Sequence, residues 1–377
     1  MKKKYLIKRT ALLLAAVMLA GLLAACGKGQ TPANEDPGRT DPGQTSNEIV
    51  SFAVSSQPVP HGLPAYVGIN NGIFEKHGLD VENMTYISGP PQMEAIPSDT
   101  WRCGVAGIAA SITGVLNYNL KIIGFSVWDQ PAHALFVRED SPIYQSGKGH
   151  LADYPEIYGT AEDYKGIDIL CAKGTVGYLN LLSTLRALGL SSDDVNVIHM
   201  EIPAAYQAFK AGEGDALITW TTYTDEAEAA GWKKVSSAEA SGLMLPTPIM
   251  ATEKALENPE VLQQYMDAML ESMMWLNDNV KDAAGNYYDM CIEEGVKTTE
   301  ESCLSTMQTH KAPSIEDFKE MMTADSDGLN GFQRYISNVM DFYIETGAYT
   351  EEDKQKMLDS IDTTYIEQAI ANFEKAG

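Results

Sequence analysis

Residues 166–190 read GIDILCAKGTVGYLNLLSTLRALGL and combine a strand pattern with a helix pattern. The apolar run 167–171 has the length of a buried strand. A Gly-Thr pair follows it, and then Leu181, Leu185 and Leu188 recur at spacings of four and three, which place them on one face of a helix. A strand that leads directly into a helix with one apolar face is the repeating unit of α/β proteins. The stretch therefore predicts a parallel α/β sheet.

The same alternation continues on both sides of this stretch. We expect strands over 49–54, 81–87, 104–108, 121–127, 134–137, 167–171, 195–199 and 216–220. We expect helices over 64–76, 91–96, 110–117, 176–188, 203–211 and 223–230. After about residue 258 the pattern is helical only, and its Met residues recur at helical spacing, which we interpret as core packing.

Length and composition limit the class of protein. The chain has 377 residues, 44% of them hydrophobic, which predicts about two domains with real cores and excludes general disorder. The chain has 27 Lys and Arg and 52 Asp and Glu, which gives a net charge of −25. Nucleic acid is therefore excluded as a partner, because neutralising phosphates requires a basic surplus. The 5 Cys are too few for a disulfide scaffold.

The first 25 residues differ from the rest. A basic head, residues 2–9, precedes the apolar run 11–20, as in a secretory signal peptide. The run ends at Leu-Ala-Ala-Cys-Gly (23–27), which resembles a bacterial lipobox and makes Cys26 the predicted lipidation site. Residues 27–47 contain no aliphatic or aromatic core former except alanine and are predicted to be a flexible tether. We therefore expect an extracytoplasmic bacterial protein held at the membrane by lipid.

Three motifs carry a family resemblance. The first is AYVGINNGIFEKHGLDVE at 65–82, and the second is GVAG at 104–107 followed by an Ala-rich helix. The third runs from KGT at 173–175 through LGL at 188–190 and FKAGEGDA at 209–216 to Trp220. In order and spacing they resemble the substrate-binding proteins of ABC importers for nitrate, sulfonates and taurine, whose relatives also bind thiamine-pyrimidine precursors.

The resemblance implies a type II periplasmic-binding-protein fold: two α/β lobes joined by a hinge, with a C-terminal helical region. The expected division is a signal peptide (1–25), lipidated Cys and tether (26–47), first lobe (48–140), insertion or hinge-proximal loop (141–165), second lobe (166–245), and return to the first lobe with the C-terminal helices (246–377). Relatives often have Asp-Pro after the Trp, where this chain has Thr221 and Thr222.

The candidate ligand contacts lie at strand ends and helix starts. Gly174 and Thr175 open a helix directly after a strand, where free backbone N–H groups meet the positive end of the helix dipole, although Thr175 could serve as a cap alone. Aromatic residues could wall a pocket, and the sequence Trp128-Asp129-Gln130-Pro131 could add a polar group. The predicted contacts are Gln57, His61, Tyr66, Gly107, Ile108, Ala109, Ala110, Trp128, Lys173, Gly174, Thr175, Val176, Tyr178, Trp220, Thr221 and Tyr223.

These features predict a binding protein. It would be a monomer that captures a small anion such as a sulfonate, taurine or nitrate and delivers it to an ABC permease and its ATPase. A thiamine-pyrimidine or other heteroaromatic ligand is the alternative, because the acidic chain offers an anion few cations. A pyrimidine-synthase-like enzyme and a structural lipoprotein without a cleft are the rival classes. We predict no catalytic residue, cofactor or metal site. Cys291 and Cys303 could form a disulfide outside the cytoplasm, and the sequence does not decide whether they do.

Overall fold

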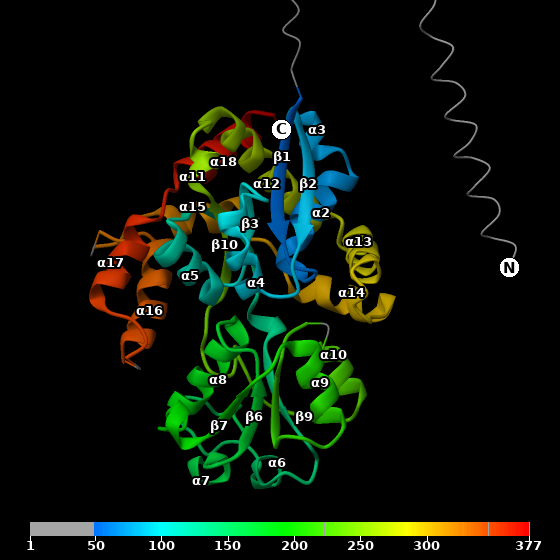
Figure 1. Cartoon of the computed structure of the whole chain (residues 1–377), viewed down its shortest axis with the longest axis vertical. Helices are drawn as coiled ribbons and strands as arrows, with labels where there is room; N and C mark the ends of the chain where they lie inside the picture. Colours follow the sequence, from blue (N-terminus) through cyan, green and yellow to red (C-terminus); the bar gives the residue numbers. More distant parts are fainter. Residues whose placement is uncertain (1–48, 222, 327, 346, 377) are drawn as a thin grey trace, which may run out of the picture. The chain divides into compact units, whose positions relative to one another are not determined.

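The computed structural model describes residues 49–221, 223–326, 328–345 and 347–376 (Figure 1). The predicted signal peptide, the lipidation site Cys26 and the tether lie outside the described residues. Among the described helices, none has the length and apolar character needed to cross a membrane.

The first sheet has five strands in the order β2-β1-β3-β10-β4. β1 pairs in parallel with β2 and β3, whereas β10 is antiparallel to both β3 and β4. The strands are β1 (Val50–Ser56), β2 (Leu79–Thr85), β3 (Cys103–Val105), β4 (Lys121–Trp128) and β10 (Pro246–Ala251). The parallel part of the sheet agrees with the alternation of strands and helices in the sequence.

The second sheet repeats this arrangement in the order β7-β6-β8-β5-β9. β6 pairs in parallel with β7 and β8, and β5 is antiparallel to β8 and β9. The strands are β5 (Ala134–Val137), β6 (Asp168–Cys171), β7 (Asn196–His199), β8 (Ala216–Thr219) and β9 (Lys233–Ser237). In both sheets the fourth strand is the one that enters from the other sheet.

The chain crosses between the sheets earlier than the sequence pattern indicated. We expected residues 134–137 to complete the first α/β unit, but they form β5 in the second sheet. The outward crossing therefore occupies 129–133, and the return occupies 238–245 between β9 and β10. The two segments are joined by hydrogen bonds from the Asp129 amide to the Leu245 carbonyl (2.8 Å) and from the Ala238 amide to the His133 carbonyl (3.1 Å).

β10 was not predicted, because its sequence PTPIMA contains two prolines. Proline cannot donate to a sheet ladder and is rarely found in a central strand. β10 accommodates Pro246 and Pro248 through a shift of register against β4 between these two residues. The strand is buried along its whole length.

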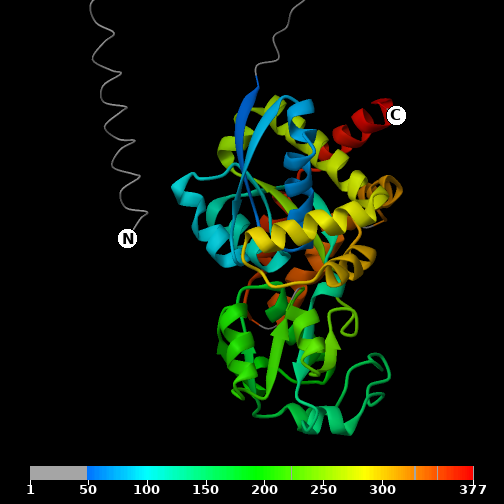
Figure 2. The same cartoon turned by 90° about the vertical axis from the view of Figure 1, so that its right-hand side faces the viewer.

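Helices flank both sheets and extend the first unit (Figure 2). Those before residue 140 are α2 (Leu63–Asn70), α3 (Ile73–Lys76), α4 (Gly89–Glu94) and α5 (Ile108–Tyr118). Those between 140 and 230 are α6 (Pro142–Ser146), α7 (Ala161–Tyr164), α8 (Val176–Ala187), α9 (Ile202–Lys210) and α10 (Tyr223–Ala229). The C-terminal helices are α11 (Glu253–Leu256), α12 (Pro259–Asp278), α13 (Val280–Glu293), α14 (Glu300–Thr309), α15 (Ile315–Met322), α16 (Gly331–Glu345), α17 (Glu351–Asp359) and α18 (Thr364–Ala376).

Local sequence explains two details of these helices. The expected helix 64–76 is split into α2 and α3, because Gly72 adopts a left-handed conformation (φ +66°) between them. Leu181 and Leu185 of α8 and Leu188 at its C-cap are buried in the core of the second sheet, as the leucine spacing predicted.

The C-terminal helices build the core of the first unit. Tyr265 of α12 contacts the rings of Phe52 on β1 and Phe74 on α3, at centroid distances of 5.5 and 5.9 Å. Met266, Met269 and Met273 of the same helix are fully buried, which confirms that Met at helical spacing fills the core here. Cys291 and Cys303 are buried free thiols, so the structure does not form the disulfide that the sequence left open.

The segment 141–165, which we expected to be a loop, contains α6 and α7 and packs on the second sheet. The Tyr158 amide donates to the Val235 carbonyl of β9 (2.9 Å), and the rings of Tyr144 and Tyr158 stack at 5.5 Å. Tyr164 is fully buried.

The stacking of Phe332 on Phe125 provides a test of how α16 holds the first sheet. The two rings are parallel within 7°, their centroids are 4.0 Å apart, and both residues are buried. We expect Phe332→Ala to lower the free energy of unfolding by about 3–5 kcal/mol in urea denaturation, because it leaves a cavity against β4. Phe373→Ala on α18, whose residue is 36% exposed, is the control and should cost less than about 1 kcal/mol. Equal losses would contradict this role for α16.

Candidate ligand-binding site

A cavity lies beside the outward crossing segment. Its walls come from the segments that follow β1, β2 and β8, from the starts of α5 and α8, and from residues 129–133. The cavity is thus bounded by elements of both sheets. A neighbouring hollow shares Val59, Ile87, Trp220 and Thr221 with it.

Half of the predicted contact residues line this cavity. They come from the β1–α2 segment, the starts of α5 and α8, and the end of β8. These residues are Gln57, His61, Gly107, Ala110, Thr175, Val176, Trp220 and Thr221.

The other predicted contacts lie elsewhere. Tyr66 donates a hydrogen bond to Glu293 of α13 (3.1 Å), and burial together with this bond raises the pKa of Tyr66 to about 12. Tyr223 lines the neighbouring hollow. Lys173 is exposed and borders a separate depression together with Tyr178.

The remaining four have roles in the backbone or the core. Ile108 and Ala109 are buried in the first turn of α5. The Trp128 amide donates to the Lys311 carbonyl (3.0 Å) at the end of β4. Gly174 has a left-handed backbone (φ +78°) in the turn that leads into α8.

Several lining residues were not among the predicted contacts. They are Val59, Ile87, Ser88, Gly89, Asp129, Ala132 and His133. There was a reason in the sequence to consider Asp129, because it is a polar residue directly after a predicted strand. His133 carried none, because its place depends on where the chain crosses between the sheets.

The starts of α5 and α8 approach each other closely at the cavity. Gly107 precedes α5, and a Cβ atom added to it would lie 2.4 Å from Cγ2 of Val176 in the first turn of α8. The Thr175 hydroxyl accepts from the Tyr178 amide (3.4 Å) and donates to the Ala172 carbonyl (2.7 Å), so it caps α8. Only a glycine at 107 allows this approach.

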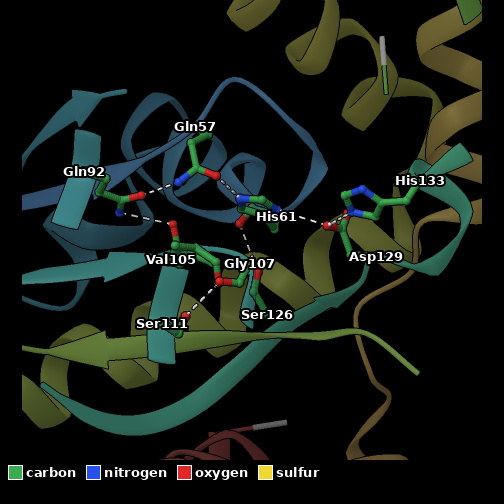
Figure 3. Close-up of polar contacts among 10 residues, drawn as sticks. Gln57, His61, Gln92, Val105, Gly107, Ser111, Ser126, Asp129 and His133 are labelled. Carbon is green, nitrogen blue, oxygen red and sulfur yellow. Dashed lines mark hydrogen bonds and ion pairs between the residues drawn. The ribbon is translucent and has the colours of Figure 1, made fainter. Parts of the chain in front are cut away.

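A chain of hydrogen bonds orients His61 (Figure 3). The Val105 carbonyl can only accept, so the side-chain nitrogen of Gln92 donates to it (3.2 Å) and the Gln92 oxygen faces Gln57. Gln57 donates to that oxygen, and its own oxygen lies 2.9 Å from Nε2 of His61. His61 Nε2 must therefore carry a proton and donate.

Asp129 joins His61 to His133. Its Oδ2 atom lies 3.0 Å from Nε2 of His133 and 3.5 Å from Nδ1 of His61 (Figure 3). All three residues are at least 94% buried. Burial raises the pKa of the Asp129 carboxyl, but the hydrogen bonds from His133 and His61 outweigh it and hold this pKa well below its usual range. The carboxylate is therefore ionised at neutral pH.

The contact between Gly107 and Val176 can be tested by a double-mutant cycle. Gly107→Ala keeps an allowed backbone (φ −59°) but places a methyl group against Val176, so it should destabilise the protein by about 1–3 kcal/mol. In the Val176→Ala background the clashing Cγ2 is gone, and the same change should cost less by about 1 kcal/mol or more. Urea denaturation of the four proteins measures the coupling. Additive effects would show that the two helix starts do not touch.

Comparison with known proteins places this chain in a family. No family model matches the chain. A protein of Brachyspira hyodysenteriae named as an ABC transporter periplasmic binding protein is 30% identical over 326 residues, covering 86% of this chain and 91% of that protein. A protein of Bacillus subtilis named as an aliphatic sulfonates-binding protein is 26% identical over 307 residues, covering 81% and 82%.

Solved structures have the same fold. The alkanesulfonate-binding protein SsuA of Xanthomonas axonopodis, bound to MOPS, aligns with a TM-score of 0.63 and 16% identity over 84% of this chain and 99% of that one. The nitrate-binding protein NrtA of Synechocystis aligns with a TM-score of 0.63 and 10% identity over 88% and 90%. The periplasmic-binding-protein fold and the family inferred from the motifs are thus confirmed, and the chain belongs to the periplasmic binding proteins of ABC transporters.

Proposed function

We propose that this protein captures a small sulfonate- or nitrate-like anion outside the cytoplasm and delivers it to an ABC permease powered by its ATPase. The observation that carries the proposal is the cavity at the crossing segment, lined by elements of both sheets. Relatives named for sulfonates support the ligand class. Capture and release break no bond, so the role needs no catalytic residue, and the binding-protein relatives support a transport role.

The ligand contacts proposed here are the cavity residues of the two helix starts and the surrounding loops. Backbone N–H groups at the starts of α5 and α8 can donate to anionic oxygens, and Trp220 provides an apolar wall. A ligand that touches both units stabilises the closed arrangement by its additional contacts there. The paired crossing segments, 129–133 and 238–245, are the natural hinge for such a closure.

The ligand class can be tested by a thermal-shift screen over taurine, alkanesulfonates, nitrate, hydroxymethylpyrimidine and riboflavin. A true ligand at 100 times its Kd should stabilise the protein by about 2.7 kcal/mol. We expect the shift from an anion of the first three classes. A response to hydroxymethylpyrimidine or riboflavin alone would favour the heteroaromatic alternative, and a flat screen would exclude all the named classes.

Trp220→Ala should abolish most of this shift while leaving the melting temperature of the free protein nearly unchanged, because the side chain is only partly buried and faces the cavity. Trp275→Ala on α12 is the matched control, since Trp275 is also partly buried but lies outside the cavity, and it should keep the shift. Loss of the shift in both variants would point to a general effect on folding.

We also propose that Cys26 carries the lipid that holds a monomeric protein at the membrane. The support is the lipobox-like sequence after the basic and apolar head of the chain. In cells fed radiolabelled palmitate, the wild-type protein should take up label and sediment with membranes. Cys26→Ser should lose the label and enter the soluble fraction, whereas Cys303→Ser, whose thiol is buried, should behave as wild type. Label retained in Cys26→Ser would contradict the anchor.

A further inference from the structure

We infer that the cavity acquires the positive charge for its anion by taking up a proton on His133, so that the anion and the proton bind together. The inference rests on the proposed function, because it concerns the chemistry of the same cavity. It makes His133 the residue that determines charge specificity.

The described residues that line the cavity include no Lys or Arg. Their ionisable groups are Asp129, His61 and His133, and Asp129 is ionised. A protein with a net charge of −25 also repels anions over longer distances. An anion therefore needs a local charge that this lining does not permanently supply.

His61 can only balance Asp129. Its Nε2 proton is committed to Gln57 by the hydrogen-bond chain from Val105. Its Nδ1 atom, 3.5 Å from the Asp129 carboxylate, interacts favourably only when it also carries a proton. A proton on this nitrogen would face Asp129 and not a ligand, so any charge on His61 would be offset by the carboxylate.

His133 has one ring nitrogen left for a ligand. Its Nε2 atom donates to Asp129 (3.0 Å), since a carboxylate can only accept. Its Nδ1 atom is buried without a hydrogen-bond partner among the described residues, and the residue is only 5% exposed while it lines the cavity. In the neutral ring, Nδ1 presents a lone pair that repels an anionic oxygen. A proton at Nδ1 converts it into a donor for that oxygen and adds one positive charge.

The other titratable groups around the three residues do not compete for this proton. His310, which follows α14, bonds the Thr306 carbonyl through Nδ1 (3.0 Å), and burial lowers its pKa, so it stays neutral. Tyr335 of α16 is buried, and burial holds the pKa of its hydroxyl far above its usual value. The charge change on anion binding is therefore assigned to His133.

Isothermal titration calorimetry with taurine, ethanesulfonate and nitrate tests the inference. Titrations run from pH 5.5 to 8.5 in bis-tris below pH 7 and in Tris above it, and at pH 7.2 in both buffers. Sulfonate and phosphate buffers are avoided, since their anions would compete with the probe. We expect the affinity to fall about tenfold per pH unit at the alkaline end. The difference in heat between the two buffers should correspond to uptake of about one proton per anion.

The variants separate His133 from other groups. His133→Asn retains a donor but cannot take up charge, so its affinity should be independent of pH and close to that of the wild type at high pH. His150→Asn is the control, because His150 is an exposed histidine that bonds the Ser146 carbonyl in the segment 141–165. This variant should keep the wild-type pH profile.

Ring nitrogen chemical shifts of the wild-type histidines, recorded with and without nitrate or taurine, provide a second readout that requires no variant. One ring should become an imidazolium on binding.

The outcomes distinguish the two proposals. If none of the three anions binds at any pH, the proposed function itself fails. If an anion binds with a flat pH profile and no proton uptake, the function stands and the inference is overturned. A pH-dependent affinity that persists in His133→Asn, or an affinity that rises with pH, also overturns it.

Discussion

The buried carboxylate of Asp129 is the interaction on which the site depends. Asp129 is the first residue of the outward crossing segment, and its backbone amide donates a hydrogen bond to the Leu245 carbonyl of the return segment. A buried charge is tolerated only when it is paired and hydrogen-bonded. His61, from the segment after β1, and His133, from the end of the crossing, supply these partners. One charge thus joins the outward crossing segment to the segment after β1 at one wall of the cavity.

The two sheets depend on each other through this crossing. Each sheet receives its fourth strand from a chain segment that has just left the other, and that strand runs antiparallel to its neighbours. α8 continues the connection, because Val176 and Leu179 pack with the core of the first unit whereas Leu181 and Leu185 pack with the core of the second. The α8 helix therefore belongs to both cores.

Much of the local structure could be predicted. The runs at 121–127 and 216–220 appear as β4 and β8 within one residue, since burial of a short apolar run depends mainly on the run itself. β10 could not be predicted, because its two prolines argue against a strand, and only the register shift against β4 makes room for them. Of the predicted contacts, Gly107, Thr175 and Val176 at the starts of α5 and α8 line the cavity. Ile108 and Ala109 in the first turn of α5 are buried instead, and Tyr66 bonds Glu293, because neighbouring side chains on a helix point in different directions.

The sequence by itself determined the α/β class, the family motifs, the helix starts at Gly107 and Thr175, and the acidic charge of the chain. These properties depend on the periodicity and the backbone chemistry of short segments, so each can be recognised from a few neighbouring residues. Only the tertiary structure decided that residues 134–137 belong to the second sheet and that Asp129 meets two histidines. Strand partners and the environment of a buried charge are set by residues far apart in the chain, so no local pattern records them.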